Sequence, residues 1–156
     1  MSDSAADAPR VMAPPPLLFA AGMVFGVLLQ YLIPVQPLPP RLARLLGGLL
    51  LVASVGVAKW GKAALARAGT PSSPNRPTRA VVTEGPFRFS RNPLYLATTG
   101  VYLGLALLLD ALWPILLLVP VLLALHWGVV RREERYLEEK FGEAYRSYKA
   151  RVRRWL

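Results

Sequence analysis

The chain has 156 residues, enough for one domain, and carries a net charge of +10. Hydrophobic residues make up 54% and charged residues 18%, whereas soluble domains have roughly 45–50% and about 25%. This balance argues against intrinsic disorder and against a soluble globular domain, and it favours a membrane protein. Because the chain has no cysteine and a single histidine, His126, neither disulfides nor a metal site is expected.

Four apolar stretches are long enough to be transmembrane helices, since a span needs about 20 residues and helices satisfy their own backbone groups in lipid. A segment rich in Ser, Ala, Asp and Pro, residues 1–16, precedes them and is expected to be a flexible N-terminus without a cleaved signal peptide. The predicted transmembrane helices cover residues 17–35, 42–60, 93–109 and 111–130. The last two form a hairpin that turns at Asp110.

Small residues recur four positions apart on two of these helices, as Gly22 with Gly26 and as Gly100 with Gly104. Such faces allow close packing of helices in a membrane. They fit contacts within the chain, and they would also permit a homo-oligomer.

The basic residues predict the topology. Sixteen of the nineteen lysines and arginines lie either from the end of the second helix to the start of the third or after the fourth. With four spans, both segments and the N-terminus share one side, which the positive-inside rule predicts to be cytoplasmic; in a bacterium the membrane would be the inner one. No aromatic–basic module accompanies the charge, so the expected partner is the lipid bilayer and not nucleic acid.

The segment between the second and third helices, residues 61–92, is expected to be a cytoplasmic loop. Near its end Gly85-Pro86 is a turn signal. Asn92-Pro93 is a helix start, with asparagine as N-cap and proline at the first helical position. This motif therefore ends at the positively polarised N-terminus of the third helix, near the membrane surface, where anions are attracted.

Four polar residues of the third helix share one face: Tyr95, Thr98, Thr99 and Tyr102. A polar face in a membrane helix meets protein or a cavity, not lipid. Hydrogen bonding to neighbouring helices is one interpretation. The other, which we prefer, is that Thr98, Thr99 and Tyr102 contact a substrate in a cavity that opens from the bilayer.

The tail, residues 131–155, is predicted to be one amphipathic cytoplasmic helix, because apolar residues recur in it at steps of three and four. Its first turn carries Glu133 and Glu134 among arginines, either as surface salt bridges or as ligand contacts. His126 lies seven residues before Glu133 on the same face, as an interfacial anchor or as a proton acceptor. The fold class is thus an all-α integral membrane protein with four transmembrane helices and this C-terminal helix.

Three segments taken together resemble the superfamily of isoprenylcysteine carboxyl methyltransferases and phospholipid methyltransferases, which are integral membrane enzymes that use S-adenosylmethionine. These segments are Gly85-Pro86-Phe87-Arg88-Phe89-Ser90-Arg91-Asn92-Pro93-Leu94-Tyr95, Glu133-Glu134-Arg135-Tyr136-Leu137 and Phe141-Gly142-Glu143-Ala144-Tyr145-Arg146-Ser147-Tyr148. The resemblance covers about residues 69–156. Asn92 stands where many members have histidine, so no imidazole can titrate at that position.

The resemblance implies that S-adenosylmethionine is the cofactor and that a lipophilic small molecule, an isoprenylcysteine-type carboxylate or a lipid amine, accepts the methyl group. The residues it implies for cofactor binding are Gly85, Pro86, Arg88, Asn92, Pro93, Tyr95, Glu133 and Glu134. The catalytic candidates are Arg91, Glu134 and His126. A carboxylate acceptor needs no base, whereas an amine must lose a proton, for which Glu133, Glu134 and His126 are available.

Two other classes of protein fit the same four helices. One is a non-catalytic membrane protein, such as a small transporter or an assembly subunit, and the other is a family member that binds the cofactor without transferring methyl. A proton-coupled transporter usually needs an acid inside the membrane. The first two helices have none and Asp110 lies at a turn, so we prefer the methyltransferase.

Overall fold

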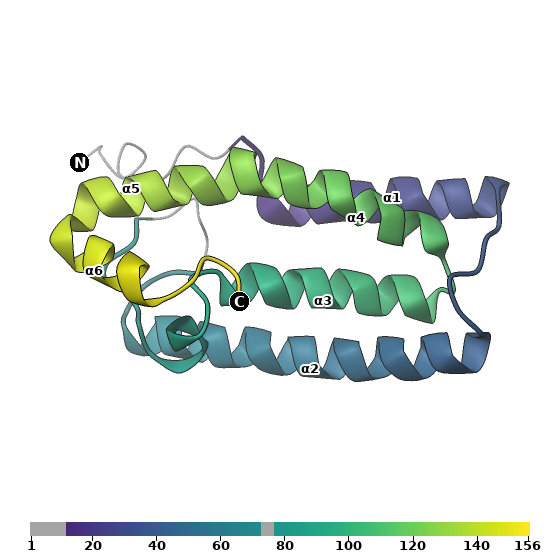
Figure 1. The fold of residues 1–156 in the computed structure, drawn as a ribbon, viewed down its shortest axis with the longest axis horizontal. Coiled ribbons are helices and arrows are strands. Elements are labelled where there is room, and N and C mark those ends of the chain that lie inside the picture. The colour runs from purple at the N-terminus through teal and green to yellow at the C-terminus, as the bar shows by residue number, and fades with distance from the viewer. Residues whose placement is uncertain (1–11, 73–76) are drawn as a thin grey trace.

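The structure, a computed structural model, describes residues 12–72 and 77–156, and its secondary structure over these residues consists of helices, with no strand among them. Most of the expected segment 1–16 and part of the expected loop 61–92 therefore lie outside the described residues. Four apolar helices run alongside one another (Figure 1). They are α1 (Pro15–Leu32), α2 (Pro40–Arg67), α3 (Pro93–Leu108) and α4 (Leu112–Leu125).

Within the described ranges, three helices are long and apolar enough to cross a membrane: α1, α2 and the long helix Leu112–Phe141 that begins with α4. The fourth apolar helix, α3, has 16 residues. The α1–α2 and α3–α4 connections lie at one end of the bundle, and the C-terminus lies towards the other (Figure 1). This confirms the all-helical class, with apolar helices long enough for a bilayer.

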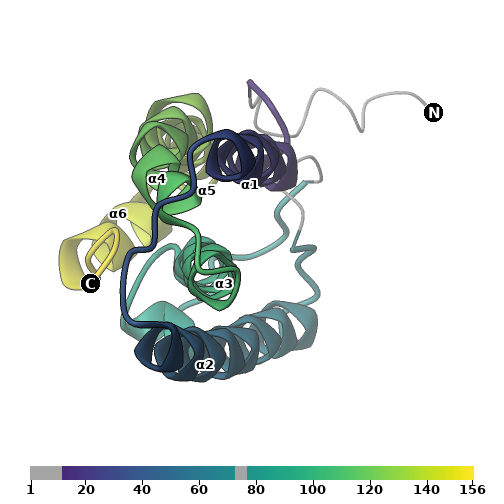
Figure 2. The same cartoon turned by 90° about the vertical axis from the view of Figure 1, so that its right-hand side faces the viewer.

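The bundle is built from two helix pairs. α2 packs along α3 and α1 packs along α4, with α3 lying between α2 and the other pair (Figure 2). Glycines make both contacts close. A Cβ at Gly47 would lie 2.8 Å from the Gly104 carbonyl oxygen, and one at Gly26 would lie 2.6 Å from the Pro114 Cα. The small-residue faces that could have served a homo-oligomer are thus covered by helices of the same chain.

We expect Gly47→Ala to lower the free energy of unfolding by about 1–3 kcal/mol, because the methyl group would meet the backbone of α3, which cannot rotate away. Gly48→Ala is the matched control, since no described atom lies within 4 Å of a Cβ at that position. Thermal unfolding in detergent measures both variants. Equal midpoints would contradict the close packing of α2 on α3.

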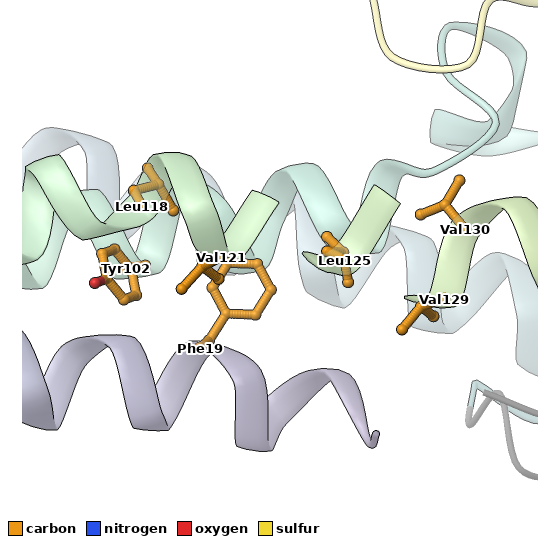
Figure 3. Close-up of a cluster of buried hydrophobic side chains, with 7 residues drawn as sticks. All are labelled: Phe19, Tyr102, Leu118, Val121, Leu125, Val129 and Val130. Carbon is orange, nitrogen blue, oxygen red and sulfur yellow. The ribbon is translucent and has the colours of Figure 1, made fainter. Parts of the chain in front are cut away.

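The buried core lies between α1, α3 and α4 and continues past the end of α4 (Figure 3). The Phe19 and Tyr102 rings are 5.9 Å apart, and the Tyr102 hydroxyl donates a hydrogen bond of 2.9 Å to the Pro114 carbonyl. Leu125, Val129 and Val130 are fully buried. Because the core continues beyond α4, it fixes the direction in which the chain leaves the apolar bundle.

A π-helical turn, His126–Val130, joins α4 to α5 (Arg131–Phe141) without interrupting the long helix (Figure 1). Such turns contain one extra residue and are frequent at functional sites. The apolar part of the helix ends at Val130, and all of the first five residues of α5 are charged. The following α6 (Glu143–Arg151) folds back against α5.

The tail therefore differs from the single helix expected over residues 131–155. Gly142 adopts a φ of +51° and separates α5 from α6, a backbone conformation that glycine reaches without a Cβ penalty. The helix ends at Arg151, and the last residues are not helical. α2 also runs past the expected boundary at residue 60, to Arg67.

Candidate functional site

A cavity lies at the end of the bundle formed by the start of α3 and by α5 and α6. Four parts of the chain line it: the end of α2 with the residues that follow, the segment before the short 3₁₀ helix Gly85–Arg88, the start of α3, and the two tail helices. The lining residues are Leu65, Thr70, Pro71, Ser72, Thr78, Ala80, Val81, Val82, Phe87, Arg91, Asn92, Pro93, Leu94, Tyr95, Glu133, Glu134, Tyr136, Leu137, Tyr145 and Tyr148. Six of the expected site residues are among them.

The start of α3 forms one wall. Pro93 occupies the first helical turn, as expected, but the Asn92 side chain makes no capping hydrogen bond. Its Nδ2 instead donates to the Arg154 carbonyl at 3.0 Å, while its backbone N–H donates to Ser90 Oγ at 3.1 Å. Asn92 thus connects the helix start to the C-terminus, which its N-cap signal did not indicate.

Glu133 and Tyr95 are both in the lining of the cavity and contact each other directly. The Tyr95 hydroxyl donates to Glu133 Oε1 at 2.7 Å. Burial raises the pKa of Glu133 to about 7; the Tyr95 hydrogen bond opposes this effect and the neighbouring Glu134 charge adds to it. A carboxyl with this pKa can accept a proton near neutral pH, and it would be stabilised in its ionised form by a cationic ligand.

Glu134 has a different environment. Arg154 donates to both of its oxygens, at 2.9 Å from Nε and 2.8 Å from Nη2, and Arg91 Nη1 lies 3.1 Å from Oε1. Burial opposes ionisation, but the hydrogen bonds from Arg154 and the charges of Arg91 and Arg154 prevail and lower the pKa of Glu134. The salt-bridge interpretation therefore applies to Glu134, although the bridge is buried and not on the surface.

Arg91 retains hydrogen-bonding capacity. Its side chain is 8% exposed, and its Nε and Nη1 make no hydrogen bond to any residue that the structure describes. The contact with Glu134 is an ion pair by distance only. Because a buried guanidinium usually has its donors satisfied, Arg91 is suited to an anionic group in the cavity.

Aromatic residues of α6 form the opposite wall. The Tyr145 and Tyr148 rings are 6.2 Å apart, and the Tyr148 hydroxyl donates to the Phe87 carbonyl at 2.6 Å. Burial raises the pKa of Tyr145 to about 12, so this phenol stays neutral. Both tyrosines belong to the third segment of the family resemblance, but neither was among the expected site residues, and tyrosine at two positions of an apolar face was the available signal.

Three residues of the loop motif do not line the cavity. Gly85 has a φ of +61°, with Trp60 3.2 Å from where a Cβ would lie. Pro86 is buried near Gly61, and Arg88 is exposed, its guanidinium 4.8 Å from the centroid of the Phe89 ring. These contacts shape the loop and place none of the three side chains in the cavity.

His126 also lies outside the cavity lining. Its ring packs edge-on against Trp127 at 5.3 Å and lies 6.4 Å from the Trp155 ring. The imidazole therefore does not line the cavity that contains Glu133, and its role as an interfacial anchor stays a prediction.

The remaining polar residues of α3 have partners within the chain. Thr98 and Thr99 donate to the carbonyls four residues earlier in the same helix, at 2.9 and 2.8 Å. Tyr102 is 3% exposed and forms its bond to α4. None of the three lines the cavity, so the hydrogen-bonding interpretation describes Tyr102 and only Tyr95 of the polar face reaches the site.

A membrane protein with long apolar helices and, at one end, a cavity with charged residues in its lining is the class defined by this fold. The sequence model of the phospholipid methyltransferase family matches residues 42–144, about two thirds of the chain. The protein belongs to this family, whose members are integral membrane methyltransferases. The match contains both motifs around the cavity and ends within α6, before Tyr145.

An uncharacterized protein of Haemophilus influenzae is 67% identical to the chain over 27 residues. These residues are 17% of this chain and 43% of that protein, so the similarity spans less than half of the relative. No solved structure matches the chain.

Proposed function

We propose that the protein transfers a methyl group from S-adenosylmethionine to a lipophilic acceptor, an isoprenylcysteine-type carboxylate or a lipid amine. One observation carries this proposal. Two segments inside the family match, Arg91–Tyr95 and Glu133–Glu134, come together around one cavity beside the apolar helices. A soluble cofactor could enter such a cavity from water, and a lipophilic acceptor could enter from the bilayer.

The chemistry of the cavity lining fits S-adenosylmethionine, which has cationic, carboxylate and aromatic parts. Glu133 offers negative charge to a cation, Arg91 offers free donors to a carboxylate, and Tyr145 and Tyr148 offer aromatic surface. The bound cofactor would supply a methyl group already activated by its sulfonium. The protein's contribution is then mainly to position the acceptor in line with that methyl.

Glu133 is the base we assign for an amine acceptor, because its pKa of about 7 allows it to take up a proton near neutral pH. Glu134 is unsuited to this role, since two guanidinium groups hold it as a carboxylate. A carboxylate acceptor would leave Glu133 with only its electrostatic role.

Two measurements test the proposal. Calorimetry should detect binding of S-adenosylmethionine to the detergent-solubilised protein, and incubation with methyl-labelled cofactor and a total lipid extract should yield a labelled lipid. Absence of binding would favour a non-catalytic membrane protein, such as a transporter or assembly subunit. Binding without a labelled product would favour a family member that has lost methyl transfer.

We further propose four spans with both termini in the cytoplasm, supported by the basic residues gathered at the cavity end. We expect a cysteine introduced at exposed Ser147 or Thr83 to react from the cytoplasmic side, and one at exposed Gln36 to react from the opposite side. The chain has no native cysteine, so labelling would report one site at a time. Labelling of Ser147→Cys and Gln36→Cys from the same side would exclude this topology.

A further inference from the structure

The C-terminal segment, residues 152–156, is bonded to the start of α3. The Arg91 N–H donates to the Arg153 carbonyl at 2.9 Å. The Arg154 carbonyl accepts from Ser90 Oγ at 3.2 Å and from Asn92 Nδ2 at 3.0 Å. The segment therefore runs along the motif that forms one wall of the cavity.

The side chain of Arg154 reaches the other motif. Its guanidinium donates to both carboxylate oxygens of Glu134 on α5, a geometry that gives strong and directional pairing. One residue thus holds the α3 start through its carbonyl and α5 through its side chain. Arg154 lies ten residues beyond the end of the family match, so this link is not part of the matched region.

The arrangement determines what Arg91 can do. Glu134 is flanked by two guanidiniums, but Arg154 takes the hydrogen-bonding positions, and Arg91 remains at ion-pair distance with its Nε and Nη1 unbonded to any described residue. Without Arg154, the Glu134 carboxylate would be open to a bidentate pair with Arg91. That pair would neutralise the cation and occupy its donors.

We propose that Arg154 is a positioning residue that satisfies Glu134 and so keeps the Arg91 guanidinium available to an anionic group of the bound ligand. The proposal rests on the proposed function, because it assigns Arg91 to the cavity where the ligand binds. The anionic group is a carboxylate, carried by the cofactor or by the acceptor. Arg154 itself need not touch the ligand.

The test compares Arg154→Gln with Arg151→Gln, which removes the same charge from an exposed position in the last turn of α6. Calorimetry with S-adenosylmethionine and labelled-methyl incorporation into a lipid extract are measured for both variants. We expect Arg154→Gln to lose roughly ten- to a hundredfold in one of these quantities, the effect of losing hydrogen bonds to a charged group. Arg151→Gln should match the wild type.

The double variant Glu134→Gln with Arg154→Gln separates positioning from loss of structure. With glutamine at position 134, no carboxylate is left to capture Arg91, so we expect most of the lost binding or incorporation to return. A role limited to folding would leave the double variant as impaired as Arg154→Gln, or more so. Arg154→Lys should be intermediate, because lysine keeps the charge but not the planar pair of donors.

A second ligand identifies the source of the carboxylate. 5′-Methylthioadenosine lacks the amino-acid carboxylate of the cofactor. If the carboxylate of the cofactor binds Arg91, Arg154→Gln weakens the binding of S-adenosylmethionine and leaves the affinity for methylthioadenosine unchanged. If the carboxylate that binds Arg91 belongs to the acceptor, the affinity for the cofactor is unchanged and only the incorporation of labelled methyl into lipid falls.

Two results overturn the inference: Arg154→Gln equal to Arg151→Gln in both measurements, or no recovery in the double variant. A wild type that neither binds the cofactor nor labels lipid would instead contradict the proposed function. The two failures are therefore distinct. Thermal unfolding of each variant confirms that the binding data refer to folded protein.

Discussion

Replacing Glu134 with glutamine should lower the free energy of unfolding by about 3–5 kcal/mol, the range for removing one partner of a buried ion pair. The Arg91 and Glu134 side chains are only 8% and 9% exposed. Without the carboxylate, Arg91 and Arg154 would face each other with no counter-charge between them. Denaturant or thermal unfolding in detergent measures the loss.

Glu138→Gln is the matched control for this prediction. Glu138 also pairs with a cation on α6, Lys149, at 3.0 Å, but the two side chains are 35% and 40% exposed. Exposed pairs contribute about 0–1 kcal/mol, so this variant should be nearly as stable as the wild type. Equal losses in the two variants would show that the Glu134 cluster has no special role in stability.

Glu133→Gln should leave stability almost unchanged and weaken S-adenosylmethionine binding by roughly ten- to a hundredfold, or about 1.5–3 kcal/mol. Glutamine can still accept the Tyr95 hydrogen bond, but it has no charge for a cationic ligand. Calorimetry gives the affinity. Glu139→Gln, at an exposed position on the same helix, is the control and should bind as the wild type does.

The same carboxyl predicts how binding depends on pH. Burial raises the pKa of Glu133 to about 7 from a usual value of 4.5. Between these two pH values the folded, ligand-free protein retains the Glu133 proton, whereas the unfolded chain has released it. The contribution of Glu133 to the free energy of unfolding therefore falls as pH rises from about 4.5 to 7. A cationic ligand favours the ionised form, so affinity should increase from about pH 6 to pH 8. A Glu133→Gln variant with the same pH dependence would assign the effect to another group.

The local features of the sequence were sufficient for most of the fold. Long apolar runs locate membrane helices because crossing a bilayer core requires a certain length of apolar helix, whatever the tertiary contacts. Proline at a first helical position likewise marks the start of α3 at Pro93. Gly142 is an instructive exception, because the apolar spacing continues across it while the backbone turns there.

The motif resemblance was enough to place Asn92, Pro93, Tyr95 and both glutamates around one cavity. It could not separate the two adjacent glutamates, whose different environments depend on Tyr95 and on Arg154, far from them along the chain. Likewise, the spacing of the α3 hydroxyls indicates a shared face but not which partner each hydroxyl meets.

Helix positions, membrane character and family were therefore determined by the sequence, through hydrophobic run length and local backbone preferences. The tertiary structure alone decided that Glu134 is a buried ion partner, that burial raises the pKa of Glu133 to about 7 and that two nitrogens of Arg91 have no hydrogen-bond partner among the described residues. The physical reason is that the charge state and hydrogen bonds of a buried group depend on the few groups brought within a few ångströms of it. Here the decisive group, Arg154, is supplied by a C-terminal segment that folds back onto the start of α3.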